Sequence, residues 1–326
     1  MKVDVVLGLA YGDEGKGKVS SALLSRGGYS HCLRFNGGGN AGHTIYHKGK
    51  KYVTHLVPSG IFHGIPCVIG PGVVLNLEKF KAELDGLRQD GLDAPVIMAH
   101  NAHVVTAQHI AEEAGESKVG TTRTGNGPAF RDKYARLGVR TQDVLEQTVN
   151  LISYWEEQGD NAVLAEGAQA FGLDIDWGDY PYVTSSHCGV AGVLTAGIPA
   201  QAIRNVYGVI KAYDTYVGAK VFQDPSDAIL DQIQTVGQEW GATTGRKRQT
   251  NYLGWDLIEQ AILSNGVTHL VVNKVDILEQ VGVWKLRYRG ETLNLGSREG
   301  FENWILTQSK KHGVQEVIFS TSPEFL

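Results

Sequence analysis

The chain has 326 residues, of which 42% are hydrophobic and 20% charged, the composition of a globular protein and not of a disordered one. Its 30 Lys and Arg against 35 Asp and Glu give a net charge of −5, which argues against a partner that is nucleic acid or a membrane surface. Three widely spaced cysteines indicate neither a disulfide framework nor a zinc site, and we expect a cytoplasmic protein. Glycine is enriched: 41 residues are roughly twice the average share of about 7%.

Short apolar runs rich in β-branched residues alternate along the chain with helical patterns. Strands are predicted at 3–7, 31–35, 52–57, 66–69, 95–99, 161–165, 205–210, 268–273 and 315–320. Helices are predicted at 17–26, 77–88, 106–115, 141–157, 255–264 and 298–311. This alternation predicts an α/β fold with a mostly parallel central sheet and helices on both faces. We expect a single domain over residues 1–326, with excursions from the sheet at roughly 100–140 and 212–254.

A glycine-rich loop, YGDEGKGK at residues 11–18, follows the first predicted strand. It contains the G-x4-G-K part of a phosphate-binding loop, in which backbone N–H groups and a helix N-terminus surround phosphate oxygens. Val19 stands where such loops place Ser or Thr to hold Mg²⁺, and Asp13 and Glu14 add negative charge inside the loop. An acid in this position indicates metal binding or proton transfer; the alternative is a glycine-rich turn with a solvated lysine.

A second polar loop, residues 36–44 with the sequence NGGGNAGHT, follows the next predicted strand. Because loops at the carboxyl ends of parallel strands converge, His43 and Asp13 could supply an acid and a base of different pKa. The alternative is that His43 is an ordinary surface histidine.

Residues 273–276, NKVD, end an apolar strand and match a guanine-binding pattern. The carboxylate of Asp276 can accept both N1–H and N2–H of guanine, a donor pair that adenine lacks. The stem of Lys274 can lie along the base, Asn273 can tie neighbouring loops together, and residues 320–323 could close over the base.

Residues 241–250, GATTGRKRQT, place three cations in a Gly/Thr loop. Two arginines two residues apart suit a dicarboxylate or phosphate clamp, and the alternative is a solvated run of charge. Similar polar segments occur earlier in the chain, at 120–128, 166–169 and 174–186. Several polar loops at strand ends indicate more than one substrate.

Together these segments resemble the adenylosuccinate synthetase family. The matching blocks are YGDEGKGK (11–18), NAGHT (40–44), VGTT and GNGPA (within 119–129), EGAQ (166–169), DIDWGDYPYVTSS (174–186), GATTGRKRQT (241–250) and NKVD (273–276). They fall in order from end to end of the chain. The resemblance implies a carbon–nitrogen ligase that joins L-aspartate to C6 of a 6-oxopurine nucleotide, normally IMP, with hydrolysis of GTP, a 6-phosphoryl intermediate and Mg²⁺.

The resemblance also implies roles for individual residues. The implied catalytic residues are Asp13, His43, Lys16 and Gln169. The implied GTP-binding residues are Gly12, Gly15, Lys16, Gly17, Lys18, Gly42, Thr44, Lys274, Asp276 and Ser320. The purine monophosphate would contact Asp13, Asn40, Thr122, Arg136, Gln169, Thr184 and Arg246. Aspartate would contact Thr244, Arg246 and Arg248, and Mg²⁺ would contact Asp13 and the Gly42 carbonyl. Arg136 would act in trans within a homodimer.

Three departures from the family pattern bear on the substrates. Ala10 and Tyr11 replace the usual Gln-Trp, Ser322 replaces a usual Gly, and the chain is shorter than typical bacterial members. Some phage relatives use dGMP, many of them with a small residue in place of the acid at position 13, so Asp13 favours IMP over dGMP; ATP in place of GTP stays open. A regulatory GTP-binding protein is a more remote alternative, because Val19 lacks the hydroxyl that such a switch needs after the loop lysine.

Overall fold

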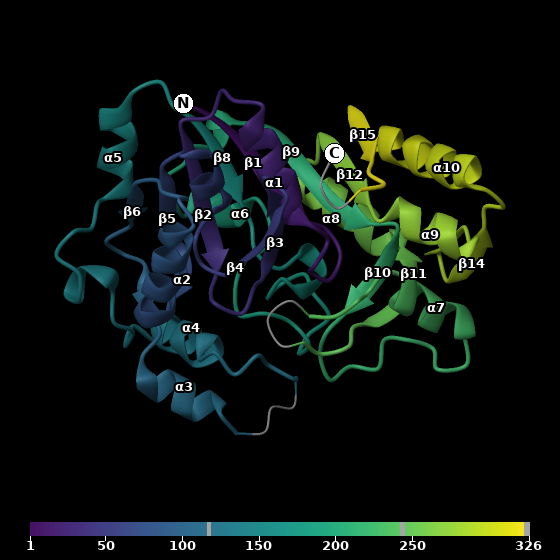
Figure 1. Ribbon diagram of the computed structural model, residues 1–326, viewed down its shortest axis with the longest axis horizontal. Coiled ribbons are helices and arrows are strands. Elements are labelled where there is room, and N and C mark those ends of the chain that lie inside the picture. The colour runs from purple at the N-terminus through teal and green to yellow at the C-terminus, as the bar shows by residue number, and fades with distance from the viewer. Residues whose placement is uncertain (116–118, 242–244, 323–326) are drawn as a thin grey trace.

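The computed structural model describes residues 1–115, 119–241 and 245–322 (Figure 1). Its largest element is a nine-stranded sheet in the order β15-β12-β9-β1-β8-β2-β5-β6, with β7 beside β5. The strands are β1 (Lys2–Gly8), β2 (His31–Gly37), β5 (Cys67–Leu75), β6 (Val96–Met98), β7 (His103–Val104), β8 (Ala162–Glu166), β9 (Ile203–Lys211), β12 (His269–Asn273) and β15 (Glu316–Phe319). All of these strands pair in parallel, which confirms the predicted sheet.

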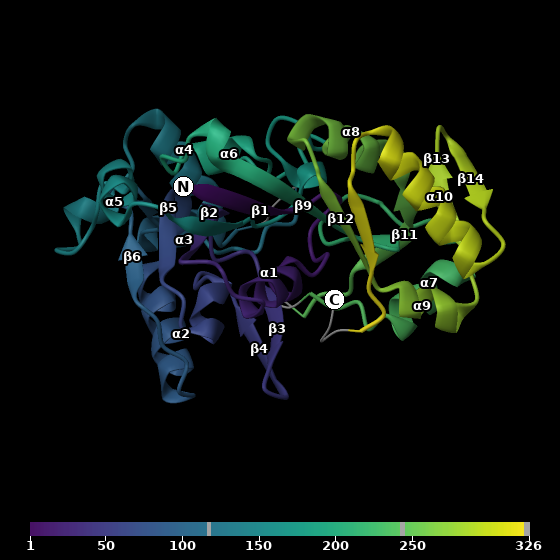
Figure 2. The same cartoon turned by 90° about the horizontal axis from the view of Figure 1, so that it is seen from above.

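Helices lie on both faces of this sheet (Figure 2). The helices of the described residues are α1 (Lys16–Ser25), α2 (Leu77–Gln89), α3 (Ala107–Glu113), α4 (Asn126–Ala135), α5 (Leu151–Gln158), α6 (Ala191–Leu194), α7 (Ala228–Val236), α8 (Trp255–Asn265), α9 (Val275–Val281) and α10 (Arg298–Lys311). Single 3-10 turns occur at η1 (Ser59–His63), η2 (Thr141–Asp143), η3 (Phe171–Leu173) and η4 (Ala200–Ala202). Among the described residues, none of the helices combines the length and apolar character that crossing a lipid bilayer requires.

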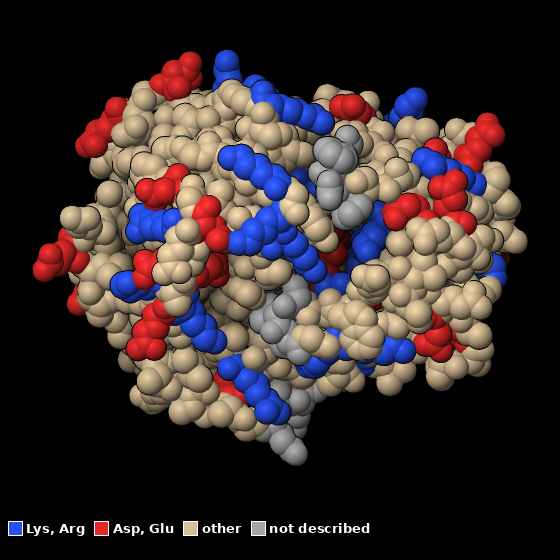
Figure 3. Space-filling model, viewed as in Figure 1, with Lys and Arg blue, Asp and Glu red and all other residues tan. Residues whose placement is uncertain are grey.

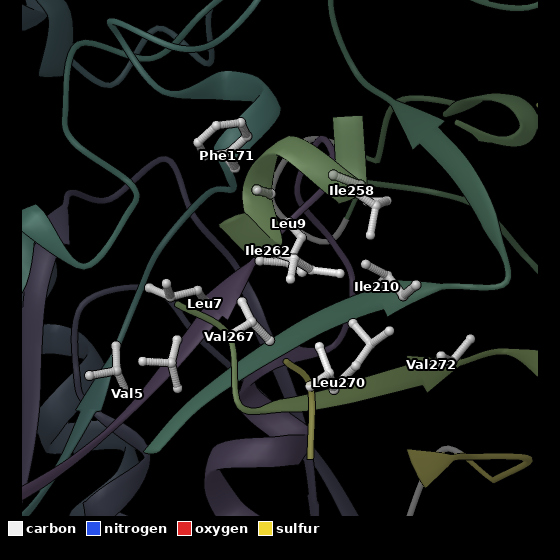
Figure 4. Packing of buried hydrophobic residues seen from close by; sticks show 14 of the residues in the cluster. Val5, Leu7, Leu9, Phe171, Ile210, Ile258, Ile262, Val267, Leu270 and Val272 are labelled. Carbon is white, nitrogen blue, oxygen red and sulfur yellow. The ribbon is translucent and has the colours of Figure 1, made fainter. Parts of the chain in front are cut away.

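The central strand β1 is buried on both sides, which explains its nearly continuous apolar sequence. Val5 and Leu7 point to one face and pack in a core that includes Ile258 of α8 (Figure 4). Val6 points to the other face and packs in a cluster with Leu23 of α1. Figure 2 shows α8 and α1 on opposite sides of the sheet. Alternate residues of one strand therefore hold two helical layers in place.

Two smaller sheets extend from the central one. β3 (His43–His47) and β4 (Lys50–Thr54) form an antiparallel hairpin. A four-stranded sheet has the order β10-β11-β13-β14, with β10 (Tyr213–Tyr216), β11 (Gln249–Gly254), β13 (Lys285–Tyr288) and β14 (Glu291–Asn294). The segment at 100–140 carries β7, which pairs with β5 in the central sheet, and then α3 and α4. The segment at 212–254 carries β10, α7 and β11. The single-domain organisation stays a prediction.

Only residues 52–54 of the strand expected at 52–57 are in a strand, and that strand is β4 of the hairpin. The expectation was wrong for residues 55–57 and for a place in the parallel sheet. Lys48 and Gly49 have φ of 49° and 76° and connect the paired residues His47 and Lys50. A two-residue turn with positive φ matches the twist of antiparallel strands, and this turn determines the pairing.

The helix expected over 141–157 is also wrong in its extent. The structure has the short turn η2 and then α5, with no helix at 144–150. Asn150 begins α5, because its side chain accepts hydrogen bonds from the N–H groups of Ile152 and Ser153. The residue before it, Val149, instead bridges to Ala99, which directly follows β6.

Candidate active site

A cavity of about 720 Å³ lies where the carboxyl ends of β1, β2, β8, β9 and β12 converge. Its volume is typical of a small-molecule site. Figure 3 shows Lys and Arg side chains gathered around a hollow on this face. The expected site residues that line the cavity are Gly12, Asp13, Gly15, Lys16, Gly17, Lys18, Asn40, Gly42, His43, Thr44, Thr122, Gln169, Thr184, Arg246, Arg248, Lys274 and Asp276. Ser320 and Arg136 do not line it, and Thr244 lies outside the described residues.

The phosphate loop is shaped by residues with positive φ. Gly12, Asp13 and Gly15 have φ of 88°, 59° and 93°, and Gly15 directly precedes α1. Only glycine adopts such angles without cost, so its spacing determines the path of the loop. The first N–H groups of α1 therefore lie at the cavity, as anion binding requires.

Glu14 has a different role from the two that its sequence position suggested. Its side chain is buried, with Oε2 at 2.7 Å from Lys16 Nζ and Oε1 accepting from Gly12 N at 2.7 Å. Gly8 leaves room for this pair: a Cβ on Gly8 would come within 2.5 Å of the Glu14 carboxylate. Glu14 thus holds the loop and its lysine, and its charge is already neutralised by Lys16.

His43 and Glu166 form a buried pair beside the phosphate loop. His43 Nδ1 lies 2.7 Å from Glu166 Oε1, while Arg34 Nη1 is 3.6 Å from the same oxygen. His43 Nε2 is buried and has no hydrogen-bond partner among the described residues. A Cβ on Gly17 would lie 2.9 Å from His43 Cβ, so the ring packs against the first turn of α1. With Nδ1 fixed by the carboxylate, Nε2 is the atom that can serve a ligand.

The charges of this pair follow from burial and from Arg34. Burial alone would raise the pKa of Glu166, but the charges of His43 and Arg34 outweigh it and lower the pKa to about 2. Burial lowers the pKa of His43, and Glu166 opposes that effect. The Glu166 carboxylate therefore accepts the Nδ1–H of His43, and an anion at Nε2 would favour the protonated ring.

Asp13 is connected to the Gly/Thr loop through Arg248. Arg248 Nε lies 2.7 Å from Asp13 Oδ2, and Arg248 Nη1 lies 2.5 Å from Glu239 Oε2. The same loop is tied to residue 120, because Arg246 Nη1 donates to the Gly120 carbonyl at 3.1 Å. Of the five N–H donors of Arg248, two contact carboxylates of the described residues, Asp13 and Glu239.

The N-K-x-D segment is joined directly to the phosphate loop. Asn273 Nδ2 donates to the Glu14 carbonyl at 2.7 Å, which confirms the expectation that Asn273 ties two loops together. Lys274 has a φ of 65°, and its Nζ donates to the Gly237 carbonyl at 2.8 Å. Asp276 lines the cavity from the first turn of α9. One edge of the cavity therefore combines the phosphate loop with the N-K-x-D segment.

Lys18 links the phosphate loop to the C-terminal segment. Its Nζ donates to Ser320 Oγ at 2.7 Å and to the Ser322 carbonyl at 2.9 Å. Burial lowers the pKa of Lys18 to about 8. Ser320 thus contacts a cavity residue without lining the cavity itself, and Ser322 does line it.

The opposite side of the cavity carries amide and hydroxyl groups. Gln169 Nε2 donates to Asn40 Oδ1 at 3.1 Å, and the buried Gln169 Oε1 has no partner among the described residues. Thr122 and Thr124 hydroxyls lie 3.0 Å apart. An unpartnered buried amide oxygen at a cavity indicates a hydrogen bond that a ligand completes.

Arg136 and Tyr11 are expected to shape the acceptor site in different ways. Arg136 is exposed just after α4, with a φ of 66°, and it stays away from the cavity of its own chain. Tyr11 lines the cavity and packs edge-on against Phe222 with ring centroids 5.0 Å apart. The aromatic ring of Tyr11 therefore lines the cavity at the position where the resemblance noted above implies tryptophan.

Sequence reasoning missed two buried acids and one lysine of this region. The sequence places Glu166 only within the polar segment 166–169, and no local pattern indicates Glu239. Lys211 lines the cavity at the end of β9, and its position at a strand end is the signal that could have identified it. A group of Asp174, Asp176 and His187 has ligand atoms within 4.8 Å of one another, but both Asp174 oxygens accept backbone N–H groups and none of the three lines the cavity.

Comparisons with known proteins agree with this geometry. The family model described as adenylosuccinate synthetase matches residues 5–154 and 148–289. The adenylosuccinate synthetase of Phocaeicola vulgatus is 39% identical over 335 residues, which cover 86% of this chain and 79% of that protein. That of Shouchella clausii is 36% identical over 352 residues, which cover 89% of this chain and 82% of that protein.

Solved structures extend the match to the whole chain. The fully ligated adenylosuccinate synthetase from Plasmodium falciparum has a TM-score of 0.82 and 25% identity, and covers 99% of this chain and 98% of its own. The cyanophage S-2L succinoaminodeoxyadenylate synthetase (PurZ), bound to dGMP and dATP, has a TM-score of 0.79, 23% identity, and coverage of 99% and 93%. The second likeness shows a shared fold alone. The family model and the curated relatives establish that this chain belongs to the adenylosuccinate synthetase family.

Proposed function

We propose that this protein joins L-aspartate to C6 of IMP with GTP as the phosphoryl donor, giving adenylosuccinate, GDP and phosphate. One observation carries the proposal: the phosphate loop and the N-K-x-D segment line the same cavity as Asp13, His43 and Gln169. A donor nucleotide at one edge could thus place its terminal phosphate beside an acceptor at the other. Curated relatives 36–39% identical bear the name adenylosuccinate synthetase, which supports this reaction.

In the first half-reaction, Asp13 removes the N1 proton of IMP and so raises the nucleophilicity of O6. O6 attacks the γ-phosphorus of GTP, the bond from that phosphorus to the β–γ bridging oxygen breaks, and GDP leaves. Lys16 and the N–H groups of the loop stabilise the charge that develops. His43, oriented at Nδ1 by Glu166, donates from Nε2 to O6 or to the transferring phosphoryl group.

In the second half-reaction, the amine of aspartate attacks C6, and the bond from C6 to O6 breaks, which releases phosphate. We assign the grip on the aspartate carboxylates to Arg246, Arg248 and Thr244. Arg248 serves both halves, because it contacts Asp13 in the absence of substrate and keeps N–H donors for a carboxylate. Asn40, Thr122, Gln169 and Thr184 would hold the purine monophosphate.

The residues near the phosphate loop fit a magnesium ion. Arg248 holds Asp13 Oδ2, and no described residue donates to Asp13 Oδ1. A free carboxylate oxygen beside a phosphate loop is a ligand that Mg²⁺ prefers, together with substrate phosphates. We propose that Asp13 and the Gly42 carbonyl hold the ion. When bound, it would neutralise charge on the phosphate oxygens.

We further propose a homodimer in which Arg136 reaches the partner's cavity. Its exposure just after α4, away from its own cavity, supports this arrangement. Sedimentation equilibrium of the purified protein measures the assembly directly: a dimer agrees with the proposal, and a monomer at assay concentration contradicts it.

A phosphate-release assay tests the reaction itself. Purified protein is incubated with GTP or ATP, with IMP, GMP or dGMP, and with or without L-aspartate, and the product is identified by mass. We expect phosphate release to require GTP, IMP and aspartate together. Turnover with dGMP and not IMP would assign the acceptor of the phage relatives, and GTP hydrolysis without aspartate or purine monophosphate would indicate a GTP-binding switch instead.

A further inference from the structure

A single buried carboxylate contacts three of the cations that line the cavity. Glu239 follows α7, is fully buried, and does not line the cavity itself. Its Oε2 lies 3.3 Å from Lys211 Nζ and 2.5 Å from Arg248 Nη1, and its Oε1 lies 3.9 Å from Lys274 Nζ. The Tyr213 hydroxyl donates to Oε1 at 2.6 Å. Glu239 thus stands behind the cavity wall and fixes side chains that face a ligand.

The charge of Glu239 is secured by these neighbours. Burial alone would raise its pKa, but the charges of Lys211, Arg248 and Lys274 outweigh burial and lower the pKa to about 2. One carboxylate therefore faces three basic side chains. If that charge were removed, the three cations would repel one another across the wall.

Glu239 also closes the stem of the Gly/Thr loop. The Arg248 N–H donates to the Glu239 carbonyl at 3.0 Å, and the next pair inward, Trp240 and Lys247, forms an antiparallel bridge. The side-chain contact between Glu239 and Arg248 reinforces this backbone pairing. The loop that we assign to aspartate is therefore anchored at Glu239.

These contacts form a continuous chain from the guanine side of the cavity to the catalytic carboxylate. Lys274 contacts Glu239, Glu239 contacts Arg248, and Arg248 contacts Asp13. We propose that Glu239 is a positioning residue that couples the two ligand sites, so that a guanine nucleotide beside Lys274 tightens the binding of aspartate at the loop of Arg248. This inference rests on the proposed function, because it uses the assignment of the loop to aspartate.

The coupling can be measured without turnover, because GDP cannot donate a phosphoryl group. Calorimetry gives the Kd of L-aspartate for protein saturated with IMP and Mg²⁺, with and without GDP. For the unaltered protein we expect GDP to lower this Kd about fivefold or more, the usual size of coupling between sites. By reciprocity, aspartate should lower the Kd of GDP by the same factor.

Two variants interrupt the chain at different points. Glu239→Gln removes the charge and keeps the size, and Lys274→Ala cuts the guanine side while the stem stays intact. In both we expect GDP, at a concentration that saturates the variant, to change the aspartate Kd by less than twofold. Lys247→Ala is the control, since the Lys247 side chain is exposed and, among the described residues, forms an ion pair only with the surface residue Asp231, at 3.5 Å. It should keep the full coupling.

Circular dichroism establishes whether each variant is folded. If Glu239→Gln does not fold, the coupling measured in Lys274→Ala alone tests the inference. Full coupling in a folded Glu239→Gln or Lys274→Ala protein would overturn the inference, and so would the absence of coupling in the unaltered protein. Failure of the proposed function is distinguishable, because it removes aspartate- and IMP-dependent phosphate release altogether.

Discussion

The substitution Glu166→Gln tests whether the buried carboxylate acts on catalysis through His43. The change keeps the size of the side chain and removes a charge that lies 2.7 Å from His43 Nδ1. His43 is expected to donate from Nε2 in the transition state, and Glu166 stabilises the positive ring that this requires. The variant should therefore slow the phosphoryl transfer more than it weakens substrate binding.

The size of the effect follows from the pKa of Glu166. Its pKa is lowered from an ordinary 4.5 to about 2, which corresponds to about 3.5 kcal/mol in favour of the carboxylate at about 1.4 kcal/mol per tenfold. Arg34 and the Ser59 N–H supply part of this preference, so the share of His43 is smaller. We expect kcat to fall by about 10-fold to 10²-fold, with the KM values of IMP, GTP and aspartate within about threefold.

The assay is steady-state phosphate release between pH 5 and 9, with Glu157→Gln, an exposed acid, as the matched control. Since Glu166 raises the pKa of His43 against the effect of burial, its loss should move the alkaline limb of the kcat profile to lower pH. Arg34 loses a buried partner in the Glu166→Gln protein. The Tm of that protein is therefore recorded, and the assay is run well below this temperature. An unchanged kcat and pH profile in a folded Glu166→Gln protein would refute the reasoning.

Three further predictions follow from the same site. Asp13→Ala and His43→Ala should each lower kcat by about 10²–10⁴, the usual weight of acid–base and charge-stabilising groups, and near-normal turnover in either would reject its role. Asp276→Asn should raise the KM of GTP by about 10²-fold or more, because an amide cannot accept hydrogen bonds from both guanine N–H groups. XTP should then become the better phosphoryl donor. An unchanged preference for GTP would contradict this prediction. Glu166 and Glu239 have pKa values lowered to about 2. Their ionised carboxylates should therefore contribute fully to the free energy of unfolding above about pH 4.5, and this contribution should be lost as the pH falls toward 2. A Tm that stays constant from pH 6 to 3 would contradict this prediction.

Much of the fold and site was predictable because its signals are local in the sequence. The apolar runs of β1 and β12 and the glycine spacing of the phosphate loop read directly as a parallel sheet with an anion site at its edge. The amide of Asn273 was expected to join two loops, and it does. The helix α4 is not predictable in the same way, because its first residues, Gly-Asn-Gly-Pro, are typical of a turn. Pro is nevertheless tolerated in the first turn of a helix.

The remaining features depend on contacts between distant residues, which no local pattern reveals. Glu14 neighbours two glycines and a lysine in the sequence, but its burial beneath the loop depends on Gly8 at the end of β1. Glu166 is separated from His43 by more than 100 residues and meets it only because β8 lies beside β2 in the sheet. Glu239 has the same character, since its partners come from three different segments.

The central claim is that the purine oxygen itself receives the phosphoryl group within one shared cavity. The direct measurement uses IMP labelled with ¹⁸O at position 6, together with GTP and L-aspartate, and determines the isotope content of the released phosphate by mass spectrometry. The account predicts that each phosphate carries one ¹⁸O atom from IMP. Phosphate that instead takes its fourth oxygen from solvent water would contradict it.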